Sequence, residues 1–179
     1  MVFTSLRDGD LNLWTADVKG RHLKQVTRQT GYDGGAYLSP DGKKMVWRSN
    51  YPSTPETLKD YKEKLAQDMV APMKMELWLA GSDGKNAKQI TNFGCASFAP
   101  AFTPDGKKII FSSNKNKCDS REFDLFMMDA DGKNLEQLTS LGGFTSFPEF
   151  SPDGKKLVFI SDWKAKQPYE FNVFVADWK

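Results

Sequence analysis

The sequence predicts an all-β fold of repeated four-stranded units, and two observations carry this prediction. One pattern occurs three times, as SPDGKKMVWRS at 39–49, TPDGKKIIFSS at 103–113 and SPDGKKLVFIS at 151–161. Short apolar runs flank Asp-Gly turns, and Asp-Gly between such runs is a strong signal for a β-hairpin because both residues accept the backbone angles of the turn. Antiparallel four-stranded units in tandem are typical of a β-propeller.

The clearest unit shows the expected strands in order. Its four apolar runs lie at 99–103, 108–113, 124–130 and 135–139. The Pro-Asp-Gly turn at 104–106 joins the first two runs, and a second Asp-Gly turn joins the last two. Each run is short and is bounded by turn residues, which is the pattern of strands in a compact sheet. We therefore expect one antiparallel sheet per unit.

The spacing of the repeats locates an insertion. Pro40, Pro104 and Pro152 begin equivalent turns, with intervals of 64 and 48 residues. The additional residues of the first interval lie at 51–73, and without them about 40 residues remain, the length of a propeller blade. The whole chain, 1–179, is thus expected to form one domain with an insert at 51–73 in its second blade.

The phase of the repeat indicates an incomplete ring. The chain begins at the second strand of a blade and ends at the third strand of another, with two complete blades between them. The prediction is a partial β-propeller of about four blades, the first without its inner strand and the last without its outer strand. Two explanations stay open: a C-terminal part of a propeller of about six or seven blades, or self-association of copies through the open blade edges.

The insert has the pattern of an amphipathic helix. Thr54 is a suitable N-cap, Pro55 suits the first helical position, and Glu56 favours the positive end of the helix dipole. A helix of about four turns ending before Pro72 is expected. Its apolar face would be formed by Leu58, Tyr61, Leu65 and Met69. This face either packs on the ends of the blades or forms a lid that faces a partner.

The three repeats resemble the TolB-type propeller repeat, which is marked by F-S-P-D-G-K followed by alternating apolar residues. The segments ADGKNLEQLT, SDGKNAKQIT and VKGRHLKQVT match its companion pattern, so the resemblance covers nearly the whole chain. It implies a β-propeller in the bacterial envelope, commonly the periplasm, where TolB-type proteins work as soluble partners in a complex. The chain shows no TolB-type N-terminal domain and no recognisable signal peptide, so the role of TolB itself is not carried over.

Several function classes are not expected. His22 is the single histidine and lies in a turn, so no base is present for a Ser-His-Asp or Cys-His arrangement. The chain has no Gly-x-Ser-x-Gly motif, no cluster with zinc-ligand spacing and no Gly-rich phosphate loop. We therefore expect no enzyme activity, no metal and no cofactor. Lysines spread over turns, with a net charge of +2, and short apolar runs predict neither nucleic-acid binding nor membrane insertion.

Binding is expected on the face that carries the insert, because loops on a rigid scaffold commonly carry recognition. Loops between the second and third strands, and between one blade and the next, emerge together on this face. They mix aromatic and charged side chains, the composition of binding hot spots, although ordinary loop packing would explain each residue singly. The candidate binding residues are Tyr32, Asp33, Arg48, Phe98, Arg121, Glu122, Phe144 and Glu149.

Two further sets of residues on this face have alternative interpretations. Asp10, Glu122 and Glu170 occupy matching positions of three blades, which favours a hydrogen-bonding role, whereas a ring of carboxylates would bind Ca²⁺. Cys95 and Cys118 lie on loops of one blade and would form a disulfide in an oxidising compartment, if their separation permits it.

The function that the sequence favours is a non-enzymatic scaffold that binds a protein or peptide partner. An accessory propeller of a peptidase or other hydrolase, which gates or presents substrate, is the alternative. A propeller that binds carbohydrate or metal is a third possibility.

Overall fold

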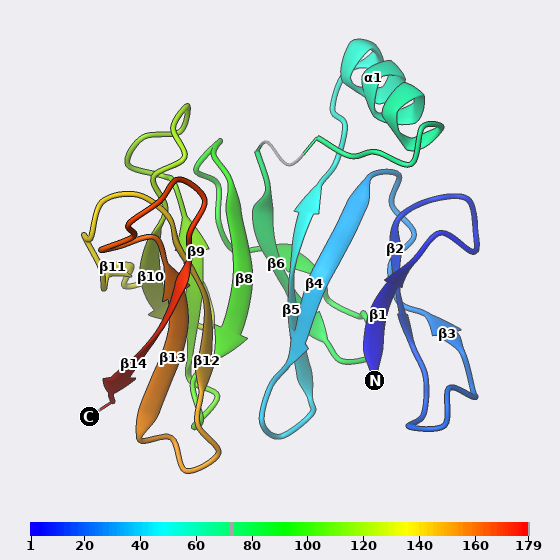
Figure 1. The fold of residues 1–179 in the computed structure, drawn as a ribbon. Coiled ribbons are helices and arrows are strands. Elements are labelled where there is room, and N and C mark those ends of the chain that lie inside the picture. The colour runs from blue at the N-terminus through cyan, green and yellow to red at the C-terminus, as the bar shows by residue number, and fades with distance from the viewer. Residues whose placement is uncertain (72–73, 179) are drawn as a thin grey trace.

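The computed structural model describes residues 1–71 and 74–178, which form four antiparallel sheets side by side (Figure 1). The sheets are β1-β2-β3, β4-β5-β6-β7, β8-β9-β10-β11 and β12-β13-β14, and each is one blade. The strands of the first two blades are β1 (Val2–Ser5), β2 (Asn12–Thr15), β3 (Lys24–Gln25), β4 (Tyr32–Leu38), β5 (Lys44–Asn50), β6 (Glu76–Gly81) and β7 (Lys88–Gln89). Those of the other two are β8 (Ser97–Phe102), β9 (Lys108–Ser113), β10 (Asp124–Asp129), β11 (Glu136–Gln137), β12 (Thr145–Phe150), β13 (Lys156–Ser161) and β14 (Asn172–Asp177).

The sheet order confirms the predicted phase of the blades. Within residues 1–71 and 74–178, the first blade has no strand inside β1, and the last has no strand outside β14, whereas the two middle blades have four strands each. Neighbouring blades contact one another through β1 and β4, β5 and β8, and β9 and β12. The described residues therefore form an open arc, a partial β-propeller.

The repeated Pro-Asp-Gly turns owe their shape to the aspartate side chain. In the first copy, Asp41 Oδ1 accepts hydrogen bonds from Ser39 Oγ at 2.6 Å and from the Lys43 backbone N–H at 3.0 Å. Gly42 follows with φ +68°, a conformation that glycine adopts without steric cost. The copies centred on Asp105 and Asp153 repeat these bonds. Figure 1 shows these turns at the end of the blades opposite the helix.

The outer strands are shorter than the sequence predicts, with two residues each in β3, β7 and β11. The cause is a threonine that follows each short strand. Its side chain accepts the hydrogen bond that a backbone carbonyl of a longer outer strand would accept. Thr27, Thr91 and Thr139 accept a hydrogen bond through Oγ1 from the backbone N–H of the neighbouring third strand, at 2.8, 2.8 and 2.9 Å. A side chain thus continues the ladder where the outer strand leaves the sheet.

The core lies between blades and not within them. Trp47, at 1% exposure, packs with Leu13 between the first and second blades. Phe111, fully buried, packs with Leu77 between the second and third blades, and Leu157 packs with Ile110 between the third and fourth. Each sheet buries its faces only against its neighbours, which is the usual dependence of a repeat fold on stacking.

The insert contains α1 (Pro55–Leu65), which confirms the predicted helix and its Thr54 cap. Its 11 residues make about three turns, one fewer than expected. The chain leaves the helix after Leu65, so Met69 does not lie on it and is half exposed. The predicted end of the insert, at Pro72 and Met73, lies outside the described residues.

A tyrosine attaches the helix to the blades. Tyr61 is buried, and its hydroxyl donates a hydrogen bond to Asp10 Oδ1 in the loop between β1 and β2. The other oxygen of Asp10 accepts from the Gly31 backbone N–H at 3.1 Å. Burial, followed by the bond to Asp10, raises the pKa of Tyr61. The helix is therefore attached through Tyr61 to the loop between β1 and β2.

Replacing Tyr61 with phenylalanine tests this attachment. The ring remains but the bond to Asp10 is lost, so the free energy of unfolding should fall by about 1 kcal/mol in urea titrations. Tyr169→Phe is the matched control, because this tyrosine is 82% exposed. Equal unfolding midpoints for both variants would show that the bond contributes nothing.

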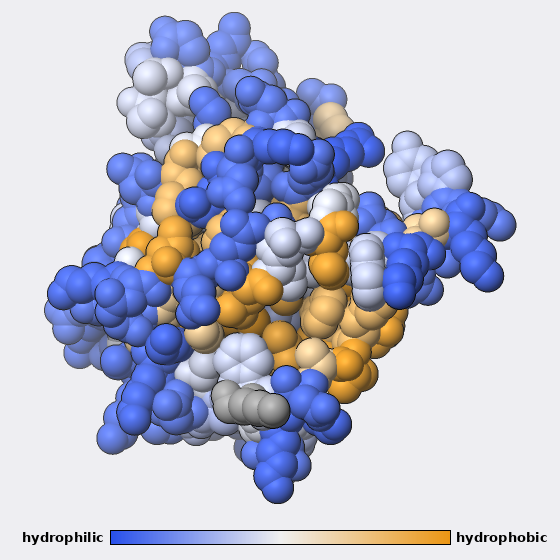
Figure 2. All heavy atoms as spheres, turned by 90° about the vertical axis from the view of Figure 1, so that its left-hand side faces the viewer, coloured by the Kyte–Doolittle hydropathy of each residue, from blue (hydrophilic) through white to orange (hydrophobic). Residues whose placement is uncertain are grey.

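The last blade presents an apolar face to solvent. Val173 and Val175 on β14 are 69% and 65% exposed, and Phe171 beside them is half exposed. Figure 2, which looks at this side of the arc, shows hydrophobic side chains gathered there. In the middle blades the equivalent faces are covered by a neighbouring blade. Across the described residues, no helix has the length and apolar character needed to cross a membrane.

Candidate functional site

A pocket of about 570 Å³ opens between the second and third blades, on the face that carries the insert. Strands β4 and β5 supply Tyr32 and Arg48, and the start of β8 supplies Phe98. The loops before β8 and after β9 complete it with the Cys95–Cys118 disulfide, Arg121 and Phe123. Its lining is mainly apolar with a few charged groups, which is the composition typical of ligand sites.

Four of the eight predicted binding residues meet in this pocket: Tyr32, Arg48, Phe98 and Arg121. Phe144 lies behind Phe98, with ring centroids 6.0 Å apart, and supports it from the fourth blade. Asp33, Glu122 and Glu149 do not line the pocket. The pocket therefore joins residues of two blades that are far apart in the sequence.

Arg48 is held between two aromatic rings. Its Nη2 and Nε donate hydrogen bonds to the Tyr32 hydroxyl at 2.8 and 3.2 Å. Its guanidinium carbon lies 5.5 Å from the centroid of the Tyr32 ring and 5.7 Å from that of Phe98, within the range of cation–π attraction. Gly34 permits this arrangement, because a Cβ there would overlap the Tyr32 hydroxyl and ring. The arginine is thus fixed in position at the edge of the pocket.

Asp33 lies inside the second blade. It is fully buried, and its Oδ1 accepts hydrogen bonds from Trp47 Nε1 at 2.8 Å, from Tyr51 Oη at 2.6 Å and from Ser49 Oγ. Burial raises the pKa of Asp33 above 3.8, against the opposing effect of these donors. Because it pairs with Ser49 as Ser97 pairs with Ser113 in the next blade, it holds a structural position of the repeat. We leave it out of the binding surface.

Glu122 and Glu149 have local partners. The Glu122 carboxylate forms an exposed ion pair with Lys117 Nζ at 2.6 Å. Glu149, on the inner strand β12, accepts a hydrogen bond from Tyr37 on the inner strand β4, and this interaction raises the pKa of Tyr37 to about 12. Glu149 thus links the second and fourth blades near the centre of the arc.

The two cysteines form a disulfide, with Cα atoms 4.9 Å apart. Cys95 is 2% exposed and precedes β8, whereas Cys118 is exposed in the loop after β9. The bond joins the two loops that line one side of the pocket. Asn114 supports the same loop, since its Nδ2 donates to the carbonyls of Cys118 and Ser120 at 2.9 and 3.1 Å.

Several residues that line the pocket are not among the predicted binding residues, and Phe123 and Lys74 are two of them. Phe123 packs against Phe98 with ring centroids 5.0 Å apart and pairs with Phe144 in an isolated bridge between blades. The sequence feature that could have identified Phe123 is an apolar residue at the end of a polar loop, directly before Asp124. Lys74 follows the insert, and nothing in the local sequence places it beside the second blade's arginine.

The three matching carboxylates are engaged separately. Asp10 binds Tyr61 and Gly31, Glu122 binds Lys117, and Glu170 accepts from the backbone N–H groups of Lys166 and Gln167 at 3.0 and 3.2 Å. Within residues 1–71 and 74–178, no three acidic, histidine or cysteine side chains gather in a metal-binding group. Asp10 thus bonds to a neighbouring loop and to the helix, as a hydrogen-bonding role requires, whereas Glu122 and Glu170 bond within their own loops.

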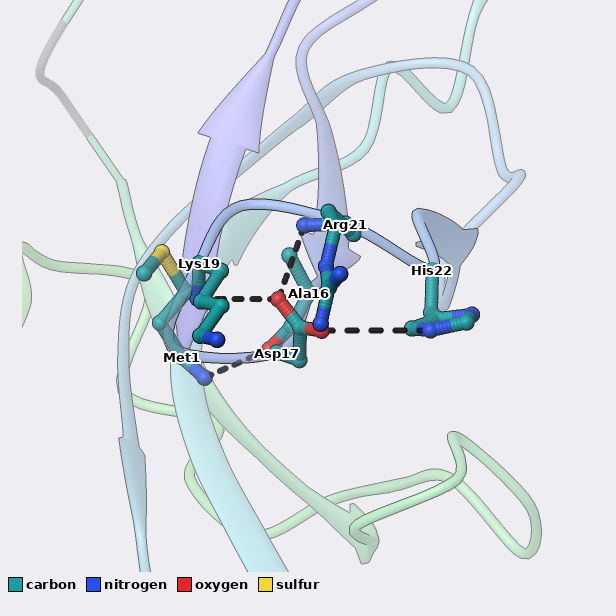
Figure 3. A network of polar contacts seen from close by, with 6 residues as sticks. All are labelled: Met1, Ala16, Asp17, Lys19, Arg21 and His22. Atoms are coloured by element: carbon teal, nitrogen blue, oxygen red, sulfur yellow. Dashed lines mark hydrogen bonds and ion pairs between the residues drawn. The ribbon is translucent and has the colours of Figure 1, made fainter.

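His22 lies away from the pocket, in the turn between β2 and β3. Its side chain is 82% exposed, and its Nε2 lies 3.9 Å from Asp17 Oδ2 (Figure 3). Asp17 mainly organises the turn, because its Oδ1 accepts from the Lys19 and Arg21 backbone N–H groups at 2.9 and 2.8 Å. The hydrogen bond from the Arg21 backbone N–H has the largest effect on the Asp17 carboxyl and lowers its pKa. No imidazole faces any nucleophile in the described structure.

A second, wider hollow of about 800 Å³ lies at the opposite ends of the blades, beside the Asp-Gly turns. Although larger, it is lined by lysines, aspartates and small residues such as Lys88, Lys107 and Asp131. Among the residues that the structure describes, its lining includes no aromatic side chain and no buried charge, so it offers little to fix a ligand. We therefore assign the candidate site to the smaller pocket.

Solved structures share the blade arrangement. TolB from Acinetobacter baumannii superimposes with a TM-score of 0.74 at 20% identity, over 98% of this chain and 37% of that one. A putative TolB from Agrobacterium tumefaciens superimposes with a TM-score of 0.71 at 20% identity, over 98% of this chain and 56% of that one. The chain thus spans little more than half of the shorter of these proteins.

Two further comparisons concern the sequence itself. Dipeptidyl-peptidase 5 of Porphyromonas gingivalis is 38% identical over 78 residues, which cover 44% of this chain and 9% of that protein. The family model described as TolB beta propeller domain matches residues 54–176, which include the insert helix, the outer two strands of the second blade and the third and fourth blades. The three repeats, the open arc of four blades and this match agree, and the chain belongs to the TolB beta propeller domain family.

Proposed function

We propose that this chain is a non-enzymatic binding module that recognises a peptide segment of a protein partner at the pocket between its second and third blades. The observation that carries the proposal is the pocket itself, where Arg48, Phe98 and Arg121 converge from separate loops and strands on one face. Aromatic and arginine side chains are enriched at binding hot spots. Arg48 and Phe98 lie on β5 and β8, strands of the two complete four-stranded blades, which hold these side chains in place.

We place this function in an oxidising compartment, the periplasm of a bacterium. Two observations support the location. The Cys95–Cys118 disulfide lines the pocket, and disulfides persist in oxidising compartments. The family resemblance points to the bacterial envelope.

A selection from two displayed libraries of linear peptides, one with free and one with blocked C-termini, tests the proposal. Peptides that bind the chain should lose at least about tenfold in affinity on Arg121→Glu, because this exposed arginine lines the pocket and forms no ion pair among the described residues. Lys88→Glu is the matched control on the opposite face and should leave binding unchanged. The proposal fails if no peptide is selected, or if both variants bind the selected peptides equally well.

An accessory role in a peptidase is the second candidate. Its support is the 38% identity to part of Dipeptidyl-peptidase 5. In this role the same pocket would hold or present a peptide substrate to a separate catalytic domain. The reading frame beside this chain distinguishes the candidates, since a hydrolase domain with a Gly-x-Ser-x-Gly motif would favour the accessory role.

The apolar face of β14 predicts self-association of the 179-residue chain. Exposed Val173 and Val175 form part of an apolar surface beside an unpaired strand edge, which favours pairing with another chain. Light scattering should give a mass of at least twice 20.2 kDa, and the Val173→Lys/Val175→Lys variant should be monomeric. Val18→Lys, in an exposed turn, is the control. A monomeric unmodified chain would contradict this prediction.

A further inference from the structure

Arg48 is a partly buried cation without a counter-charge. Its described polar contacts are the two hydrogen bonds to the Tyr32 hydroxyl, and no carboxylate of the described residues forms an ion pair with it. A buried or half-buried charge is usually paired, because removal from water costs free energy that a neutral hydroxyl only partly offsets. The guanidinium also retains N–H groups that Tyr32 does not use, since Arg carries five donors.

Other cationic side chains near Arg48 also have no acidic partner in the part of the chain that the structure describes. Lys74 and Arg121 line the pocket, and neither forms an ion pair among the described residues. Among the described residues, Asp119 is the one acidic side chain of the lining. The pocket therefore has three cationic groups against one anionic group, and it favours an anionic ligand.

The surface next to Arg48 is aromatic. Phe98 lies 5.7 Å from the guanidinium carbon, and its ring packs on Phe123, with centroids 5.0 Å apart, and on Phe144 at 6.0 Å. These contacts come from the third and fourth blades and hold the Phe98 ring in place. An apolar or aromatic group of a ligand would bury its surface against Phe98 and Phe123.

We propose that the pocket binds the C-terminal residue of a peptide, with its carboxylate on Arg48 and a large apolar side chain on Phe98 and Phe123. This inference rests on the proposed function and specifies its ligand. A C-terminal residue carries a carboxylate and a side chain on one Cα, which matches a cation placed directly beside an aromatic surface. An acidic side chain fits less well, because successive side chains of an extended peptide point to opposite sides.

Three short peptides test the proposal by calorimetric titration: acetyl-Gly-Gly-Phe with a free carboxylate, its C-terminal amide, and acetyl-Asp-Phe-amide. The free acid should bind at least about tenfold more tightly than either amide, the effect of a charged hydrogen-bonded pair. Arg48→Met should remove the difference between the acid and its amide. Lys107→Met, at the opposite ends of the blades, should preserve it.

Tyr32→Phe is a second variant that retains the ring and loses the hydroxyl that positions the guanidinium; affinity for the acid should fall severalfold, by the order of one lost hydrogen bond. The proposal is overturned if the acid and its amide bind equally, if acetyl-Asp-Phe-amide binds as tightly as the acid, if Arg48→Met keeps the preference, or if no peptide binds. Library peptides that bind at the pocket without a free C-terminus would overturn this inference alone and leave the proposed function standing.

Discussion

Replacing Asp33 with alanine should lower the free energy of unfolding by roughly 3 to 5 kcal/mol, because three donors, two of them buried, lose their acceptor. Trp47 Nε1, Ser49 Oγ and Tyr51 Oη all donate to Asp33 Oδ1 within the second blade. Urea titrations followed by circular dichroism measure the change. Ser97→Ala at the equivalent position of the third blade is the matched control, since it removes one side-chain bond, to Ser113 at 3.0 Å, and should cost about 1 kcal/mol.

The same aspartate should make stability depend on pH. Burial raises its folded-state pKa above the ordinary 3.8, so the folded state binds the proton more tightly than the unfolded state does. The stability from this group is complete below pH 3.8 and is lost as the pH rises through the folded pKa. Asp33→Asn cannot titrate, so it should lack the pH-dependent part of the stability that comes from Asp33. As the pH rises from 3.8 through the folded-state pKa, the free energy of unfolding of this variant should increase relative to that of the unmodified chain. A difference in the free energy of unfolding between the two proteins that stays constant with pH would contradict the raised pKa of Asp33.

Removing the disulfide should have the second largest effect. Cys95 and Cys118 are 23 residues apart, and closing a loop of this length in the unfolded chain corresponds to about 3 kcal/mol. Cys95→Ala/Cys118→Ala should therefore have a lower melting temperature and a looser pocket, because both cysteines line it. Added reductant should lower the melting temperature of the unmodified chain and leave that of the variant unchanged.

Thiol counting gives the independent control for this prediction. The unreduced chain should show no reactive thiol and the reduced, denatured chain should show two, one for each cysteine. Two reactive thiols before reduction, or a melting temperature of the unmodified chain that does not change with reductant, would contradict the Cys95–Cys118 disulfide.

The blades could be predicted because their signals are local. Each Pro-Asp-Gly turn is built by its own aspartate and glycine, so the three copies identify the hairpins without reference to the rest of the fold. The missing inner and outer strands followed from the phase of the same copies. The length of the outer strands could not be predicted from local patterns, because Thr27, Thr91 and Thr139 bind across to the third strand of each blade.

The pocket was predictable only in part. The sequence placed Tyr32, Arg48, Phe98 and Arg121 on one face, but their meeting depends on how the second and third blades pack. Asp33 lies in GYDGG, a run of turn residues that suggests an exposed loop. The alignment of Asp33 with Ser97 and Thr145, each bound to a serine of the second strand, shows instead that this position faces the interior.

Hydrogen exchange in the presence of a selected peptide tests the central claim, that the partner binds between the second and third blades on the insert-bearing face. The account predicts slower exchange of backbone amides at 93–98 and 114–123, the loops that line the pocket, and unchanged exchange at Gly42, Gly106 and Gly154 in the Pro-Asp-Gly turns. Protection confined to those turns, with the pocket loops unchanged, would contradict it.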